Sequence, residues 1–464
     1  MMGSGSEPSL REGSDPSHAS LGVESLSAGK GSDPSMFPET RMIRSLRPLV
    51  LALALVATTA AAVSPSVEGE ALEQVVLLSR HNLRAPLVSS GALADATPHA
   101  WATWDVAAGE LSTKGGVLEV YLGRYLGQWL RQQQVLPATG CPQEGDFHAL
   151  ANSLQRTQAT AQFFVAGAFP GCHVTVQQRR PLGTMDPLFD PVIHRDDAGF
   201  QRRALLAMQK AESQALLGPD LQVVEGVVEH VSSPACAGRS PCALQAGDSR
   251  FRVEAGREPG ASGSLALANG MVDALLMQDY QNDSGTPAGW GRLHGDAQWQ
   301  ALARVRNGYQ DILFGTPEVA RDVAAPLLSH IDGLFADPQS PKVSLLVGHD
   351  SNIGAVLAAL GAADYTLPGQ LEKTPIGGLL QFERWRVHSG EARYRLVYVY
   401  PTRTQLRDAL PLSDAQPPGR VELALPGCGQ DGCSDVQFKR LLHRAVDEPI
   451  RSADQRSAPT TGVQ

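Results

Sequence analysis

Two short apolar runs, far apart in the sequence, each end in a cluster of charged side chains. Residues 72–79 read LEQVVLLS and residues 343–347 read VSLLV. Apolar runs of this length are typical of strands buried on both faces of a largely parallel sheet. RHNLRAP follows the first run and GHD follows the second. Because ligands of open α/β sheets bind beyond the carboxyl ends of the strands, we expect the two clusters to converge in space.

Helical signals fill much of the remaining sequence. Ser112 or Thr113 can cap a helix through VLEVYLGRYLGQWLRQQQ, whose apolar residues recur every three or four positions, and Pro137 lies beyond its end. Further helices are expected at SLQRTQATAQFFVAGAF, 200–217, NGMVDALLMQDYQ and VARDVAAPLLSHIDGLF, and strands at RYRLVYVYP and RVELALP. The predicted class is α/β, with a mainly parallel sheet flanked by helices in a core formed by 70–159 and 336–446, and a mainly helical insertion at 160–335.

The two ends of the chain differ from this pattern. Residues 1–41 are rich in Ser, Gly and Pro, contain GSDPS twice, and are expected to be disordered, as is the tail 447–464. Residues 42–62 combine arginines, a short apolar run and a final AAA, which predicts a secretory signal peptide cleaved after Ala62. The disordered extension would then reflect a start codon assigned too early. The apolar run is shorter than the roughly 20 residues of a membrane-spanning helix, so we expect a periplasmic protein without a mature span.

Charge and cysteine content narrow the class further. The net charge of −9 over 464 residues leaves no basic stripe for nucleic acid, so any anion site must be local. Six cysteines in an exported chain indicate disulfides, and no Cys/His spacing typical of a zinc site is present. Sequence alone does not select the connectivity. Sequential pairing is the simplest because it closes short loops: Cys141 with Cys172, Cys236 with Cys242, and Cys428 with Cys433.

The cluster RHNLRAP places one histidine between two arginines. Imidazole can attack phosphorus as a nucleophile, and guanidinium groups match phosphate oxygens. The same cations would keep His81 neutral and reactive at moderately acid pH. A solvated basic loop is the alternative interpretation. For GHD the alternative is an N-cap formed by Asp350 ahead of SNIGAVLAALG, which is compatible with a role in chemistry.

SRHNLRAP resembles the RHGxRxP signature of the histidine acid phosphatases, and Gly348-His349-Asp350 resembles the HD pair of that family. Other segments, among them TKGGVLEVY, ANSLQRT, GTMDP, NGYQD, GHDSNI and TPIGG, are similar to its glucose-1-phosphatase branch. In that branch an asparagine, here Asn82, replaces the glycine of the general signature. The similarity covers nearly all of the mature chain and implies a histidine-phosphatase-like core.

The resemblance implies a role for each matching residue. His81 matches the nucleophile that would form a phosphohistidine. Asp350 matches the proton donor to the leaving oxygen, a role that needs a protonated carboxyl, whose pKa a bound phosphate would raise, and hence an acidic optimum. Glu258 matches an acidic residue that contacts sugar hydroxyls. The residues that match phosphate-binding positions are Arg80, Arg84, Arg156 and His349. The resemblance implies no metal and no other cofactor.

The favoured function is hydrolysis of glucose 1-phosphate, and a phytase or broad-specificity phosphomonoesterase of the same family is the alternative. Export disfavours a mutase with the same core. A non-catalytic sugar-phosphate binding protein would lack His81 or Asp350, and both are present. The expected partner is a small phosphate monoester, with no nucleic acid and no membrane after signal cleavage. The chain would be a monomer or a homodimer.

Overall fold

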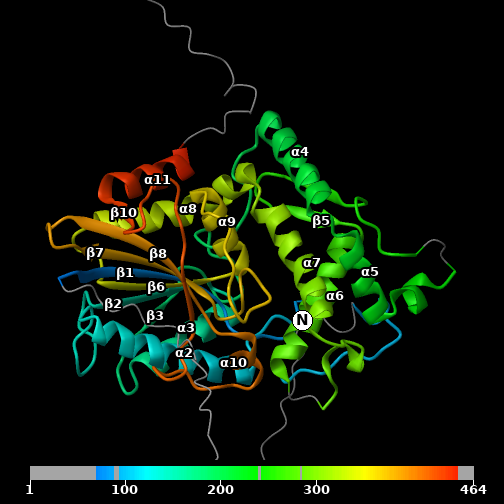
Figure 1. The fold of residues 1–464 in the computed structure, drawn as a ribbon, viewed down its shortest axis with the longest axis horizontal. Coiled ribbons are helices and arrows are strands. Elements are labelled where there is room, and N and C mark those ends of the chain that lie inside the picture. The colour runs from blue at the N-terminus through cyan, green and yellow to red at the C-terminus, as the bar shows by residue number, and fades with distance from the viewer. Residues whose placement is uncertain (1–68, 88–92, 239–241, 283–284, 448–464) are drawn as a thin grey trace, which may run out of the picture. The chain divides into compact units, whose positions relative to one another are not determined.

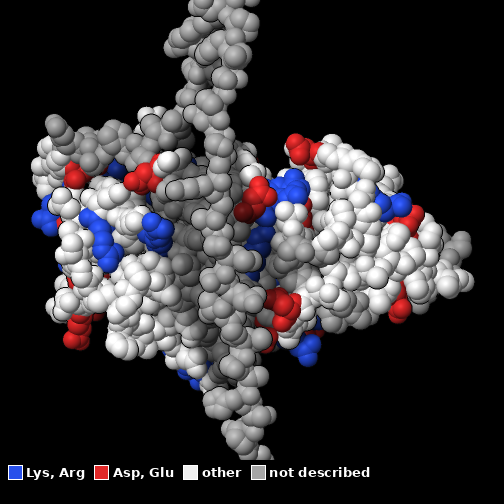
Figure 2. Space-filling view, turned by 90° about the horizontal axis from the view of Figure 1, so that it is seen from below, with Lys and Arg blue, Asp and Glu red and all other residues white. Residues whose placement is uncertain are grey.

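The computed structural model describes residues 69–87, 93–238, 242–282 and 285–447. The predicted extension (1–41) and signal peptide (42–62) lie outside the described residues. So does the predicted tail, apart from Asp447, the last residue of helix α11 (Asp435–Asp447). Within the described ranges, no helix is long and apolar enough to cross a membrane. Basic and acidic residues are interspersed over the described part of the face in Figure 2.

An eight-stranded sheet forms the centre of the fold (Figure 1), in the order β10-β8-β7-β1-β6-β2-β3, with β9 paired to β8. Its strands are β1 (Ala71–Arg80), β2 (Phe147–Ala151), β3 (Val176–Gln177), β6 (Val343–Gly348), β7 (Leu379–Arg386), β8 (Ala392–Tyr400), β9 (Gly419–Glu422) and β10 (Cys433–Ser434). The two apolar runs are thus β1 and β6. They are parallel neighbours, with Arg80 opposite Gly348. Their carboxyl ends therefore meet, as the sequence predicts.

The sheet is mixed rather than mainly parallel, which corrects one part of the prediction. The pairs β1–β6, β6–β2 and β2–β3 are parallel, whereas β1–β7, β7–β8, β8–β9 and β8–β10 are antiparallel. The connection between β7 and β8 is only five residues long, from 387 to 391, and a link this short can join only antiparallel strands. The α/β class itself is confirmed.

Helices cover both faces of the sheet (Figure 1). Val75 and Leu77 of β1 pack in one core with α2 (Thr113–Gln132) and α3 (Gln155–Ala168). Val76 and Leu78 point to the other core, which contains α8 (Pro317–Ala336), α9 (Asp350–Leu360) and α11. This alternation follows from the two-residue period of a strand, and it explains why β1 is apolar throughout.

The middle of the chain is mainly helical, as predicted. It contains α4 (Ala198–Ala215), α5 (Gly218–Val228), α6 (Ser264–Gln281) and α7 (Asp296–Phe314), with a two-stranded sheet of β4 (Arg250–Arg252) and β5 (Gly260–Ser262). Three short helices also lie in this region: η1 (His230–Ser232), η2 (Pro234–Cys236) and η3 (Ala288–Gly291). A further short helix, α10 (Arg403–Arg407), lies between β8 and β9. The division at 160 and 335 stays a prediction. Helix α3 runs across the first of these positions and packs on α2.

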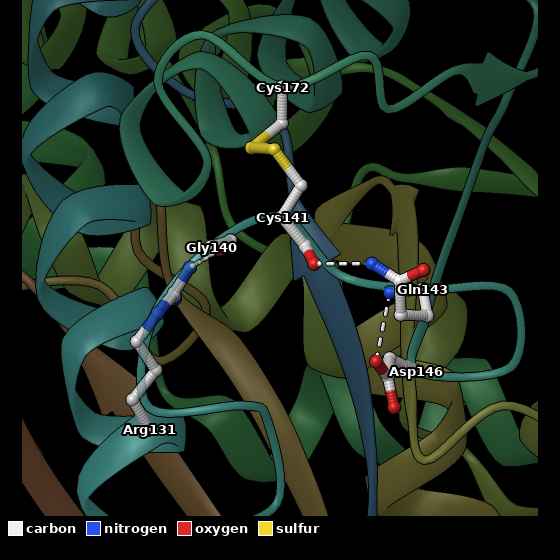
Figure 3. Close-up of a disulfide and its surroundings, with 6 residues drawn as sticks. All are labelled: Arg131, Gly140, Cys141, Gln143, Asp146 and Cys172. Carbon is white, nitrogen blue, oxygen red and sulfur yellow. Dashed lines mark hydrogen bonds between the residues drawn. A yellow bond between two sulfur atoms is a disulfide. The ribbon is translucent and has the colours of Figure 1, made fainter.

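All three predicted disulfides are present in sequential order: Cys141–Cys172, Cys236–Cys242 and Cys428–Cys433. Figure 3 shows the first, which joins the segment after α2 to the segment after α3. Beside it, the side chain of Gln143 donates to the Cys141 carbonyl and its backbone N donates to Asp146 (Figure 3). The bridge thus closes the pair of helices at the end remote from His81.

Candidate active site

The first motif forms the turn that leaves β1. Arg80 is the last residue of the strand, and the backbone N of His81 donates to the Gly348 carbonyl at 3.0 Å. The His81 ring is buried, and its Nδ1 lies 2.9 Å from the Asn82 carbonyl. Since a carbonyl only accepts, Nδ1 carries the hydrogen and Nε2 keeps its lone pair. Burial, followed by the charges of Arg156 and Arg84, lowers the pKa of His81 well below its usual value. The imidazole is therefore neutral, as a nucleophile must be.

The second motif forms the turn that leaves β6. His349 is the N-cap of α9 and Asp350 is its first residue, which corrects the prediction of Asp350 as the cap. The Asp350 side chain instead accepts from the backbone N of Ser351 at 3.0 Å. The ring centroids of His81 and His349 are 5.6 Å apart, so the two predicted clusters do meet. Burial and the charge of Arg156 lower the pKa of His349 to about 3.

Near His81, three arginines carry buried N–H groups that have no hydrogen-bond partner among the described residues. These groups are Nε and Nη2 of Arg80, Nε of Arg84 and Nε of Arg156, although Arg80 Nη2 does lie 3.4 Å from the Asp350 carboxylate. Buried donors are normally satisfied, and an unsatisfied one costs free energy. Arg80 and Arg84 are 0% and 1% exposed. Donors of this kind clustered around a neutral imidazole fit an anion with several oxygens, such as phosphate.

Carboxylates from distant segments hold these arginines in place. Asp273 on α6 forms a two-pronged ion pair with Arg84, at 3.0 and 2.9 Å. Glu372, in the segment before β7, accepts from Arg80 at 3.1 Å. Sequence reasoning missed both. For Asp273 a signal exists, since it is a charged residue in the otherwise apolar stretch MVDALLM.

Arg306 on α7 is a further residue that the sequence motifs do not indicate. It is 5% exposed, and its Nη2 lies 2.5 Å from Asp350 Oδ2. Its Nη1 donates to Asn269 at 3.1 Å, and Gln310, one turn along α7, donates to the same Asp350 oxygen at 3.3 Å. Burial alone would raise the pKa of Asp350, but the charges of Arg80 and Arg306 lower it well below its usual value. The expected protonated carboxyl is therefore not the state of this site before phosphate binds.

Glu258 lies in the turn between β4 and β5 and is exposed to solvent. Partial desolvation, followed by the negative charges of Asp190 and Asp350, raises its pKa. It also interacts electrostatically with Arg156, whose pKa is lowered to about 10 by burial and by Arg84. Glu258 thus belongs to the same electrostatic cluster as the other predicted residues. Asp190 is an additional acidic neighbour that sequence reasoning did not single out.

An imidazole with a free Nε2, ringed by guanidinium groups at the strand ends of an α/β sheet, defines the class of phosphatases that use histidine. The chain belongs to the histidine phosphatase superfamily (branch 2), whose profile matches residues 71–216. It is 46% identical to glucose-1-phosphatase of Salmonella typhimurium, over 87% of this chain and all of that protein. It is 36% identical to phytase AppA of Escherichia coli, over 81% and 92% of the two chains.

A solved structure shows the same fold. Hafnia alvei phytase in complex with tartrate superimposes with a TM-score of 0.76 at 31% identity, over 82% of this chain and 98% of that one. The family resemblance in the sequence is therefore confirmed, together with the α/β fold class.

Proposed function

We propose that this chain is an exported acid phosphatase that hydrolyses glucose 1-phosphate to glucose and phosphate through a phosphohistidine on His81. The observation that carries the proposal is the set of unpartnered N–H groups of Arg80, Arg84 and Arg156 around the His81 imidazole, whose Nδ1 is engaged by the Asn82 carbonyl so that Nε2 keeps its lone pair. The 46% identity to a glucose-1-phosphatase over nearly the whole chain supports the substrate.

The reaction has two steps. In the first, His81 Nε2 forms a bond to phosphorus while the bond from phosphorus to the sugar oxygen breaks, and Asp350 gives its proton to that oxygen. In the second, water attacks phosphorus, the P–N bond breaks, and the Asp350 carboxylate takes a proton from the water. The enzyme returns to its starting state, with one water consumed.

The charges around His81 explain how Asp350 would obtain its proton. Leaving aside the exposed Glu258, four guanidinium groups (Arg80, Arg84, Arg156, Arg306) face three carboxylates (Asp273, Asp350, Glu372), so the free site has a net charge of +1. A phosphate dianion changes this to −1. Binding of a proton would neutralise this excess negative charge, and Asp350, next to the phosphate, is the carboxylate positioned to receive the proton. Substrate and proton would therefore bind together, which favours activity at acid pH.

Arginines also supply the charge stabilisation that phosphoryl transfer requires. His349, close to His81 in the fold, would add a further donor to the phosphate. We therefore expect activity without a metal ion or other cofactor. Glu258 would accept hydrogen bonds from the sugar hydroxyls and, as a carboxylate, disfavour substrates with a second phosphate.

A phytase is the second candidate, favoured by the likeness to phytase AppA and to the Hafnia alvei structure. The negative charge of Glu258 and Asp190 beside the site is the observation against a polyphosphorylated substrate. We propose the periplasm as the location, after removal of a signal peptide within 42–62. The substrate would be the only partner, apart from a second copy if the chain forms a homodimer.

The decisive experiment measures phosphate release from glucose 1-phosphate and from phytate at acid pH, with and without a chelator. We expect glucose 1-phosphate to be the better substrate and the chelator to have no effect. Acid quench within one turnover should trap a phosphohistidine that is absent from His81→Ala. A better rate on phytate would reverse the order of the two candidates, and failure to trap phosphate on His81 would contradict the mechanism.

A further inference from the structure

Helix α2 carries a fully buried glutamate, Glu119, which contacts the turn after β1. This turn contains His81 and Asn82 and is called the nucleophile turn below. Glu119 is 0% exposed, and its Oε2 accepts a hydrogen bond from Asn82 Nδ2 at 2.7 Å. Its second oxygen, Oε1, has no hydrogen-bond partner within the described part of the chain. Glutamate is rarely buried completely unless it is paired. The pairing here is with an amide rather than a cation, which makes the position costly for a carboxyl that serves packing alone.

The protonation state of Glu119 makes this arrangement tolerable. Burial raises the pKa of Glu119 to about 8, although the hydrogen bond from Asn82 lowers it. At acid pH the carboxyl is therefore neutral. It still accepts from Asn82, because a neutral carboxyl keeps an acceptor oxygen.

Asn82 connects Glu119 to the nucleophile. The carbonyl of Asn82 is the group that accepts from His81 Nδ1 at 2.9 Å and so leaves Nε2 free for attack. The backbone N of the same residue donates to Thr160 on α3 at 3.0 Å. Asn82, the residue whose carbonyl orients His81, is thus held by α3 through its backbone N–H and by α2 through its side chain.

The amide of Asn82 has little room to turn away from Glu119. Gly377, at φ +64°, packs against this amide, and a Cβ at that position would come within 2.7 Å of Asn82 Nδ2. The Asn82 Oδ1 is already occupied by the backbone N of Leu83 at 2.8 Å. Each polar atom of the amide therefore has one defined partner, and removal of Glu119 would leave Nδ2 buried without its acceptor.

We propose that Glu119 is a positioning residue for the nucleophile: its hydrogen bond to Asn82 holds the Asn82 carbonyl against His81 Nδ1 and keeps Nε2 directed at phosphorus. The inference rests on the proposed function, since it takes His81 as the attacking group. Asn82 and Glu119 act as a unit, because a glycine at position 82 would have no amide to anchor.

The test compares Glu119→Leu with Glu119→Gln on p-nitrophenyl phosphate at acid pH. Leucine removes the acceptor, so kcat should fall about tenfold or more while KM changes little, because a misdirected Nε2 slows the attack on phosphorus rather than substrate binding. Glutamine keeps an acceptor oxygen in the same place and should restore most of kcat. Rapid acid quench should show slower formation of the phosphohistidine in Glu119→Leu.

Two controls separate positioning from stability. Leu126→Ala removes a side chain from the same buried face of α2 and should lower the melting temperature without lowering kcat of the folded enzyme. In an Asn82→Gly background, Glu119→Leu should cost much less than in the wild type, because the donor it orphans is gone.

The outcomes distinguish this inference from the proposed function. If wild-type enzyme is active but Glu119→Leu keeps its kcat, or loses it only in proportion to unfolding as Leu126→Ala does, the positioning role is wrong. Equal losses for Glu119→Leu in the wild-type and Asn82→Gly backgrounds would also overturn it. A wild-type chain that forms no phosphohistidine would instead contradict the proposed function, and this inference with it.

Discussion

Asp350 lies between two guanidinium groups, with Arg306 at 2.5 Å and Arg80 at 3.4 Å. An aspartate held in this way is ionised in the free protein, and it can act as an acid only after the substrate has changed the local charge. In the mechanism that we propose, Arg306 would couple proton uptake to substrate binding. The ion pairs of Arg84 with Asp273 and of Arg80 with Glu372 fix the two guanidinium groups that would bind the phosphate oxygens.

Asp350→Asn removes the proposed proton donor. Asparagine cannot donate a proton to a sugar oxygen, so turnover of glucose 1-phosphate should fall by about 10² to 10⁴. Nitrophenolate leaves without protonation, and turnover of p-nitrophenyl phosphate should fall much less. Steady-state kinetics on both esters check this, and equal losses would show that Asp350 is not the proton donor.

A second prediction concerns Glu258, which is exposed next to Arg156 in the electrostatic cluster. Glu258→Ala should weaken kcat/KM for glucose 1-phosphate by about tenfold, the worth of one hydrogen bond to a charged group, and improve the relative rate on phytate. The rate on p-nitrophenyl phosphate serves as the internal control and should stay close to wild type. A uniform loss of rate on all three esters would show that Glu258 does not determine which substrate is preferred.

At the scale of elements, the start of α2 packs directly on the nucleophile turn. The backbone N of Ser112 donates to the Leu83 carbonyl at 3.0 Å, and its hydroxyl caps the helix by accepting from Gly115 N at 3.1 Å. Gly115 is required by this close approach, because a Cβ there would lie 2.1 Å from the Leu83 carbonyl oxygen. Helix and turn can therefore move only together.

Gly115→Ala should displace the turn and lower kcat by about tenfold to a hundredfold, since misplacement by about 1 Å can cost that much. Gly333→Ala is the matched control. Gly333 lies inside α8 with nothing within 4 Å of the added Cβ, so that variant should keep kcat and gain up to about 1 kcal/mol of stability. Wild-type kcat in Gly115→Ala would mean that the turn does not depend on its contact with α2.

At the scale of the whole molecule, buried carboxyls predict how stability varies with pH. Burial would raise the pKa of Asp273, but Arg84 and Arg306 lower it from 3.8 to about 2. Its contribution to stability is present above pH 3.8 and is lost as the pH falls toward 2. Glu119 acts in the opposite direction: burial raises its pKa from 4.5 to about 8, so its contribution is full below pH 4.5 and is lost as the pH rises toward 8.

Because the pKa values of His81 and His349 are lowered from 6.5, their contribution to stability is lost as the pH falls below 6.5. We therefore expect the melting temperature to be highest near that pH and to decline on both sides. Thermal melts over the pH range from 2 to 8 check this. Glu119→Gln, which cannot ionise, should show a shallower decline on the alkaline side. If wild type and Glu119→Gln have parallel profiles there, Glu119 is not the group responsible.

Much of the fold could be predicted because burial leaves a local record in the sequence. Apolar periodicity and caps such as Ser112 predict β1, β6, β8 and the helices α2, α3, α4, α6 and α8, whereas α5, α7 and α11 were not predicted. β7 was missed, because Gln381 and Glu383 interrupt its apolar pattern. Both are buried, and the Glu383 carboxylate accepts hydrogen bonds from Gln381 Nε2 and from Trp385 Nε1.

By itself, the sequence indicated the residues for which we propose chemical roles, since they occupy short motifs at the ends of strands: His81, Arg80, Arg84, His349 and Asp350. Only the tertiary structure decided which groups hold them. Asp273 is 189 positions from Arg84, Glu372 is 292 positions from Arg80, and Glu119 is 37 positions from Asn82. The reason is physical: a strand or helix reflects neighbours a few residues apart, whereas the partner of a buried charge is chosen by long-range packing.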